Sequence, residues 1–194
     1  MGKNILASSS PRRAEILKDK YVFEIIPSPY EEVHTTTVFS YAYVENLAYN
    51  KAKAVVPLVK EESMIIGADT VVVLDGKILE KPHDSEDAKG MLRKLSNREH
   101  QVVTSIALIN SKTGESVIKS TTSHVVFNYL TEEMIDYYVD NFKPLDKAGA
   151  YGIQELPEGY VKSYSGSLEN IIGICPKALD ECFQRLLFRE NPLK

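Results

Sequence analysis

Near its start the chain reads Asn4-Ile5-Leu6-Ala7-Ser8-Ser9-Ser10-Pro11-Arg12-Arg13, followed by Ala14-Glu15-Ile16-Leu17-Lys18. The apolar run predicts a first strand over residues 3–8, and the second segment predicts a helix over residues 11–19. Ser10 is a favoured residue at a helix N-cap, and Pro11 suits the first helical turn. A strand that turns directly into a helix is typical of α/β folds, and such corners are where these folds bind phosphates.

Two arginines occupy the first turn of this predicted helix. Free N–H groups and the helix dipole already place partial positive charge there, so Arg12 and Arg13 are unfavourable at that position unless an anion binds beside them. Adjacent arginines are also common on solvated surface turns, where they form weak ion pairs. The cap position favours a phosphate clamp, for which the forked donors of arginine are suited.

The bulk properties describe an ordinary soluble chain. Its 194 residues are 43% hydrophobic and 26% charged, and no linker is visible, so we expect one domain over residues 1–194. A net charge of −4 gives no general attraction to nucleic acid or acidic membranes. Two cysteines without metal-ligand spacing indicate a reduced, cytoplasmic protein, and no apolar run predicts a signal peptide or a membrane span.

Strands and helices alternate only in part along the chain. Residues 64–74 are almost continuously apolar, which is typical of a central strand buried on both faces. We expect a mixed α/β fold with a sheet that is not purely parallel. Further strands are predicted over residues 22–26, 77–79, 102–110, 116–129 and 159–164, and further helices from a Ser40 cap to Pro57, over 84–95, over 132–141 behind a Thr131 cap, and from Pro176 onward.

One carboxylate interrupts the long apolar run. Burying an ionised Asp69 is costly unless it is paired or bound to a metal. It is either a strand-end aspartate bonded to nearby backbone or a carboxylate at a strand terminus that acts as general base or metal ligand. Glu31 and Glu32 lie in a loop over residues 27–40, and they are solvated charges unless that loop folds toward Asp69 to share a divalent cation.

Lys51 and Lys81 are candidate phosphate ligands only if the fold brings both of them close to Arg12 and Arg13. Lys51 lies near the inward face of the predicted helix after Ser40, and Lys81 follows the short strand over residues 77–79. Exposed lysines are the usual case.

Residues 146–154 read Asp-Lys-Ala-Gly-Ala-Tyr-Gly-Ile-Gln, and their small residues permit close approach of a flat ligand. Tyr151 could stack on such a ligand and Gln154 could read a base edge, although a compact surface turn is an equal interpretation. His100 has no neighbouring nucleophile in the sequence, so we interpret it as structural.

Six stretches together resemble the Maf family of nucleoside triphosphate pyrophosphatases, in family order and over most of the chain. They are residues 7–13, 47–52, 67–72, 76–82, 95–104 and 146–154. The resemblance implies cleavage of a nucleoside triphosphate between its α and β phosphates, with a divalent metal such as Mg²⁺ or Mn²⁺. It also implies an elongated, two-lobed mixed α/β fold with a central cleft, similar to that of inosine triphosphate pyrophosphatases.

The resemblance also implies roles for particular residues. Asp69 matches the proposed proton acceptor, and the acidic loop supplies a metal ligand, for which we favour Glu32 over Glu31. The position after Asp69 and the end of residues 146–154 resemble the dTTP/UTP branch of the family. The matches to the phosphate site are Ser8, Arg12, Arg13, Lys51 and Lys81, those to the metal site are Asp69 and Glu32, and those linked to substrate choice are Arg12, Thr70 and Gln154.

Rival functions remain open at this point. The family is also linked to arrest of septum formation, so a nucleotide-binding regulator without catalysis is one alternative, and it would need the cations but not Asp69. A phosphatase with Asp75 as nucleophile is disfavoured, because no second aspartate follows two residues later. A small-molecule triphosphate is the expected partner, a homodimer is possible, and neither nucleic acid nor a membrane is expected.

Overall fold

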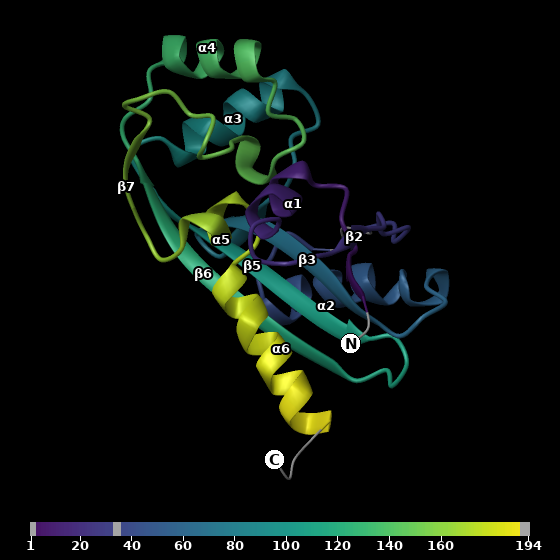
Figure 1. The fold of residues 1–194 in the computed structure, drawn as a ribbon. Coiled ribbons are helices and arrows are strands. Elements are labelled where there is room, and N and C mark those ends of the chain that lie inside the picture. Colours follow the sequence, from purple (N-terminus) through teal and green to yellow (C-terminus); the bar gives the residue numbers. More distant parts are fainter. Residues whose placement is uncertain (1–2, 33–35, 191–194) are drawn as a thin grey trace.

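The computed structural model describes residues 3–32 and 36–190. Within these residues seven strands form one sheet in the order β2-β1-β3-β5-β6-β7, with β4 paired to the end of β3 (Figure 1). β1 runs parallel to β2 and β3, and the remaining pairs are antiparallel, which confirms the mixed α/β prediction. The strands are β1 Lys3–Leu6, β2 Glu24–Ile25, β3 Ser63–Leu74, β4 Lys77–Leu79, β5 Glu99–Asn110, β6 Ser116–Phe127 and β7 Val161–Ser165.

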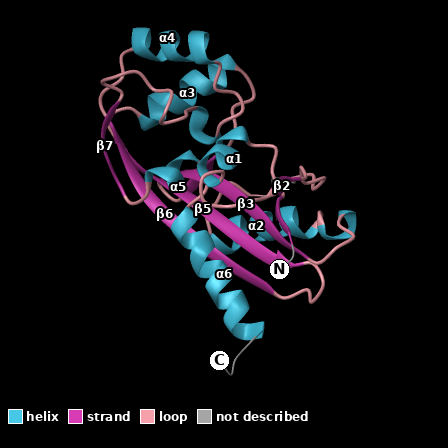
Figure 2. Ribbon diagram, in the orientation of Figure 1, coloured by secondary structure: helices cyan, strands magenta, loops and turns pink. Residues whose placement is uncertain are grey.

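Helices cover both faces of the sheet and one end of its long strands. The helix α2 packs on one face over Ile65 and Ala107, and α1 and α6 pack on the other over Ile66 and Leu108. α3 and α4 form a second lobe at one end of the strands, as Figure 2 shows. The helices are α1 Pro11–Leu17, α2 Tyr41–Lys53, α3 Ser85–Leu95, α4 Glu132–Phe142, α5 Leu168–Ile172 and α6 Pro176–Glu190, with short 3-10 turns at Val56–Leu58 and Ala148–Ala150.

Side-chain caps fix where several helices begin. Ser40, Asp84 and Thr131 each accept a hydrogen bond from the backbone N–H three residues later, which satisfies a free donor of the first turn. Ser10 occupies the N-cap position of α1 as predicted, but its side chain makes no cap hydrogen bond. The Ser10 N–H is instead bonded to the Ser8 side chain, at 3.2 Å.

Several boundaries differ from those predicted. β1 ends at Leu6 rather than at residue 8, because its pairing with β3 stops there. β5 begins at Glu99 rather than at residue 102, because the ladder to β6 continues through His100. The short helix α5 was not predicted, and it forms because Ser167 caps it. Part of the predicted loop over residues 27–40, residues 33–35, lies outside the described residues.

A gap in strand pairing along β3 opens the sheet. β1 pairs with β3 only as far as Ile66, and β4 pairs with the same edge only from Val72 onward. Within the described residues, no strand covers that edge over residues 67–71, whereas β5 covers the other edge throughout. Asp69 and Thr70 lie in this gap, and successive side chains of a strand point to opposite faces. The gap therefore leaves one carboxylate and one hydroxyl beside an uncovered stretch of strand edge, on different faces of the strand.

Candidate active site

A cleft of about 1440 Å³ opens at this gap between the two lobes. It collects segments from α1, α2, β3, the β4–α3 connection, residues 146–154 and the end of α5. Glu31, by contrast, is exposed and does not line the cleft. The residues matched to the phosphate site, the metal site and substrate choice all line it: Ser8, Arg12, Arg13, Glu32, Lys51, Asp69, Thr70, Lys81 and Gln154.

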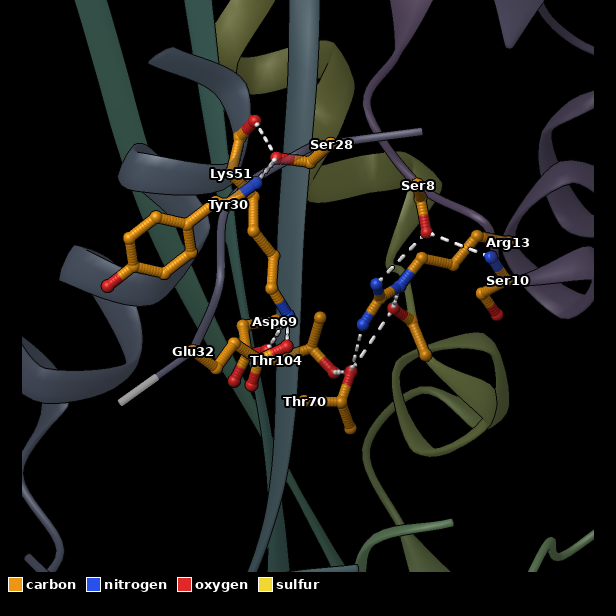
Figure 3. A network of polar contacts seen from close by, with 11 residues as sticks. Ser8, Ser10, Arg13, Ser28, Tyr30, Glu32, Lys51, Asp69, Thr70 and Thr104 are labelled. Atoms are coloured by element: carbon orange, nitrogen blue, oxygen red, sulfur yellow. Dashed lines mark hydrogen bonds and ion pairs between the residues drawn. The ribbon is translucent and has the colours of Figure 1, made fainter. Parts of the chain in front are cut away.

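On the α2 face of β3, one lysine joins two carboxylates. Lys51 Nζ lies 2.5 Å from Asp69 Oδ1 and 2.7 Å from Glu32 Oε1 (Figure 3). Asp69 is only 6% exposed, so the ammonium group offsets the cost of burying its charge. The prediction of a strand-terminal Asp69 was wrong, because β3 continues past it to pair with both β5 and β4. It is the neighbouring β1 that ends, and this leaves a mid-strand carboxylate open to the cleft.

Small residues bring α2 close enough for Lys51 to reach Asp69. Gly67 faces α2, and a Cβ there would lie 2.3 Å from the Ala48 carbonyl oxygen and 2.8 Å from the Ala52 Cβ. The helix backbone thus rests almost directly on the strand. The Ser28 hydroxyl donates to the Lys51 carbonyl oxygen at 2.8 Å, and this anchors the loop that carries Glu32.

On the opposite face of β3, the Arg13 guanidinium donates hydrogen bonds to three groups of the protein. Its Nε donates to the Gly173 carbonyl oxygen at 2.9 Å, one Nη to Ser8 Oγ at 3.3 Å and the other to Thr70 Oγ1 at 3.2 Å (Figure 3). Burial lowers the pKa of Arg13, and the charge of Asp69 opposes that shift. Thr70 also contacts Thr104 Oγ1 at 2.9 Å. Arg13 therefore ties α1 to β3 and to the residue after α5.

Arg12 is more exposed and meets an acidic partner across the cleft. Its Nη1 lies 2.9 Å from Asp146 Oδ2, and Lys147 Nζ lies 2.8 Å from Asp146 Oδ1. Burial raises the pKa of Asp146, but hydrogen bonds from Lys147 and Arg12 outweigh it and lower the value to about 2. Lys147 was not singled out from the sequence, and the nearby pattern of small residues gave no sign that its side chain is almost buried.

Residues 146–154 are shaped by a left-handed turn. Gly149 and Ala150 have φ of 66° and 60°, and a Cβ at Gly149 would lie 2.9 Å from the Val72 side chain. Tyr151 is buried, with its hydroxyl 2.6 Å from His100 Nε2 and its ring against Phe127. It anchors the segment instead of standing free to stack on a ligand.

His100 is the other half of that anchor. Its ring is 2% exposed, and burial lowers its pKa to about 4. A neutral, buried imidazole fits the structural interpretation made from the sequence.

One cation in the cleft, Lys81, has no partner among the described residues. Lys81 is exposed, and within the part of the chain that the structure describes it makes no hydrogen bond or ion pair.

Burial raises the pKa of Tyr43, and the negative charges of Glu80, Asp69 and Glu32 add to that shift. The cleft thus places carboxylates on the α2 side and leaves Lys81 available for an anion.

A divalent metal fits two of these residues. Among the described residues, no three His, Cys, Asp or Glu side chains form a metal cluster on their own. Asp69 and Glu32 nevertheless surround one positive group, the Lys51 ammonium, so their oxygens already face a common cation. Mg²⁺ commonly takes one or two carboxylates and completes its shell with phosphate oxygens and water. The donor set therefore suits a metal that arrives with a phosphorylated substrate.

Comparisons with known proteins match one family over almost the whole chain. The family model described as "Maf-like protein" matches residues 3–186. The chain is 41% identical to a dTTP/UTP pyrophosphatase of Vibrio vulnificus strain YJ016, over 90% of this chain and 93% of that one. It is 44% identical to proteins of the same name from Thermotoga maritima, over 87% and 82% of the two chains, and from Escherichia coli O157:H7, over 87% and 85%.

A solved structure also matches over most of the chain. It is a nucleoside-triphosphatase, named dITP/XTP pyrophosphatase, of Mycobacterium abscessus, with a TM-score of 0.45 at 18% identity, covering 94% of this chain and 93% of that one. At that score the assignment rests on the sequence matches alone. No helix in the described part of the chain is long and apolar enough to cross a membrane.

Proposed function

Because this chain belongs to the Maf family, we propose that it hydrolyses dTTP and UTP between the α and β phosphates, releasing a nucleoside monophosphate and pyrophosphate. The relatives' names supply the two nucleotides and the pyrophosphatase reaction. The observation that carries the proposal is the Lys51 ammonium held between Asp69 and Glu32 in a cleft that also holds Arg12 and Lys81.

The cations are arranged to hold a polyanion. Lys81 has no protein partner within the described residues and is free to meet the triphosphate first. Arg12 exchanges Asp146, which is 61% exposed, for a phosphate, because an exposed ion pair is weak and a bidentate arginine–phosphate contact is stronger. Arg13 acts indirectly, since its donors fix Ser8 and Thr70 beside the bound phosphates.

Asp69 is the residue we assign to proton transfer. Lys51 bonds to its Oδ1, whereas its Oδ2 makes no hydrogen bond within the described residues. Lys51 thus fixes the carboxylate orientation and leaves one oxygen to accept a proton from the attacking water. Asp69 and Glu32 would hold Mg²⁺ or Mn²⁺, which when bound supplies charge neutralisation and lowers the pKa of water. The protein chiefly positions the reacting groups and balances their charge.

We also propose that residues 1–194 form one domain, because both lobes contribute residues to the cleft. We place its activity in the cytoplasm, where free nucleotides and unpaired cysteines such as Cys175 and Cys182 are both expected.

The test is a panel of nucleoside triphosphates assayed with and without Mg²⁺ in ¹⁸O-labelled water. We expect pyrophosphate from dTTP and UTP, only with metal, and the label in the monophosphate, because water attacks the α phosphorus. Orthophosphate as the released product would contradict the assigned cleavage point. Binding of dTTP with no product at all would favour the regulator without catalysis, which the names of the relatives do not favour.

A further inference from the structure

A continuous chain of polar contacts joins two residues that the family resemblance links to substrate choice. It starts at Arg12, whose Nη1 lies 2.9 Å from Asp146 Oδ2, and Asp146 Oδ1 lies 2.8 Å from Lys147 Nζ. Lys147 Nζ then lies 3.1 Å from Glu155 Oε2, and Glu155 Oε1 accepts from the Gln154 amide nitrogen at 3.5 Å. Arg12 and Gln154 therefore lie at opposite ends of one chain of contacts that runs through Asp146, Lys147 and Glu155.

The last contact determines which way the Gln154 amide faces. An ionised carboxylate only accepts hydrogen bonds, so the NH₂ end of the amide faces Glu155 and the oxygen end faces away. The reverse orientation would set two oxygens against each other. Gln154 lines the cleft and Glu155 does not, which leaves the amide oxygen for the cleft. Gly152 makes room for this arrangement, since a Cβ there would lie 3.2 Å from the Gln154 amide nitrogen.

Lys147 holds Glu155 in place. Its side chain is 9% exposed, and its single ammonium group is shared between two carboxylates, those of Asp146 and Glu155. Both carboxylates are thus held toward the same nitrogen atom.

We propose that Glu155 is a positioning residue for pyrimidine selection, which rests on the proposed hydrolysis of dTTP and UTP. It fixes the Gln154 amide so that the amide oxygen accepts from the N3–H of uracil or thymine. The second amide hydrogen is then free to donate to a neighbouring carbonyl oxygen of the base. Cytosine presents an acceptor at N3 and an amino donor beside it, so the fixed amide opposes both groups. Without Glu155 the amide rotates to suit cytosine.

The experiment compares Glu155→Gln with Glu158→Gln, a matched change at an exposed glutamate in the same segment that does not line the cleft. A glutamine at position 155 both donates and accepts, so it no longer selects one amide orientation. Steady-state pyrophosphate release gives kcat and KM for UTP and for CTP, and thermal melting checks folding. We expect the UTP-to-CTP ratio of kcat/KM to fall about tenfold in Glu155→Gln, mainly through a lower KM for CTP, and to stay at the wild-type value in Glu158→Gln.

A second measurement separates positioning from a general structural role. In a Gln154→Leu background the amide is absent, so adding Glu155→Gln should leave the ratio unchanged. Two results would overturn the inference while the proposed function stands. In one, Glu155→Gln leaves the UTP-to-CTP ratio of kcat/KM at the wild-type value. In the other, Glu155→Gln lowers that ratio equally with and without Gln154. A wild-type chain that releases no pyrophosphate from either pyrimidine triphosphate overturns the proposed function, and this inference with it.

Discussion

Replacing Gly67 by alanine tests the packing that brings Lys51 to Asp69. The new Cβ would lie 2.3 Å from the Ala48 carbonyl oxygen and 2.7 Å from the Ala52 nitrogen. An ordinary carbon–oxygen contact is about 3.3 Å, so α2 must move from β3 by roughly 1 Å. Such overpacking typically costs about 1–3 kcal/mol, and a contact with backbone falls at the upper end. For a chain of this length, about 3 kcal/mol lowers Tm by roughly 6–12 °C.

The assay combines thermal melting with pyrophosphate release from UTP below the melting transition. We expect Gly67→Ala to lower both Tm and kcat, because the shift of α2 moves Lys51 away from Asp69 Oδ1. Gly90→Ala is the matched control: a Cβ there meets nothing within 4 Å, and alanine favours a helix such as α3. It should raise Tm by about 1–4 °C, from a gain of about 0.5–1 kcal/mol. A Gly67→Ala protein with wild-type kcat would refute the claim that this close approach positions the lysine.

Three further predictions concern stability, packing and metal. Burial holds the pKa of His100 at about 4 in the folded chain against 6.5 for an ordinary histidine, so the unfolded chain binds more protons between these values. Between pH 7 and pH 5, the unfolding free energy of wild type, measured by chemical denaturation, should therefore fall by about 2 kcal/mol more than that of His100→Gln. Equal falls in both proteins would contradict the burial argument. Thr70→Val removes the acceptor of one Arg13 donor and should lower the unfolding free energy by about 1–3 kcal/mol, whereas Thr70→Ser keeps the hydroxyl and most of that stability. Chelating the metal should abolish turnover, and Glu32→Gln should raise the Mg²⁺ concentration for half-maximal turnover about tenfold or more. An unchanged Mg²⁺ requirement in Glu32→Gln, or an equal rise in Glu31→Gln, would remove Glu32 as a metal ligand.

Local sequence signals predicted most of the fold. The apolar run over residues 64–74 became β3, a central strand, because a run that is apolar on both faces is stable when packed layers cover both sides. Ser40 and Thr131 marked helix starts because a cap depends only on residues within one turn. The short helix α5 was missed because five residues carry no readable periodicity, and β5 began earlier than predicted because the charged Glu99 and polar His100 hid a strand.

The family resemblance predicted most of the residues that line the site. The contacts between those residues were not predicted. No pattern within a short window links Arg13 to the Gly173 carbonyl oxygen or Arg12 to Asp146, because these partners are 160 and 134 residues apart. The interruption of pairing along β3, which opens the cleft beside Asp69, likewise depends on where a different strand stops. The sequence also did not single out Lys147 and Glu155, because a charged residue that is buried or paired looks the same in sequence as an exposed one.

The most direct measurement of the central claim is pyrophosphate release from UTP by Asp69→Asn in the presence of Mg²⁺, beside nucleotide binding and melting of the same protein. The change keeps the shape of the side chain but removes the group that accepts the proton. We expect a folded protein that still binds UTP and loses nearly all turnover. Turnover equal to that of wild type, in a folded Asp69→Asn protein, would contradict the account of how this cleft works.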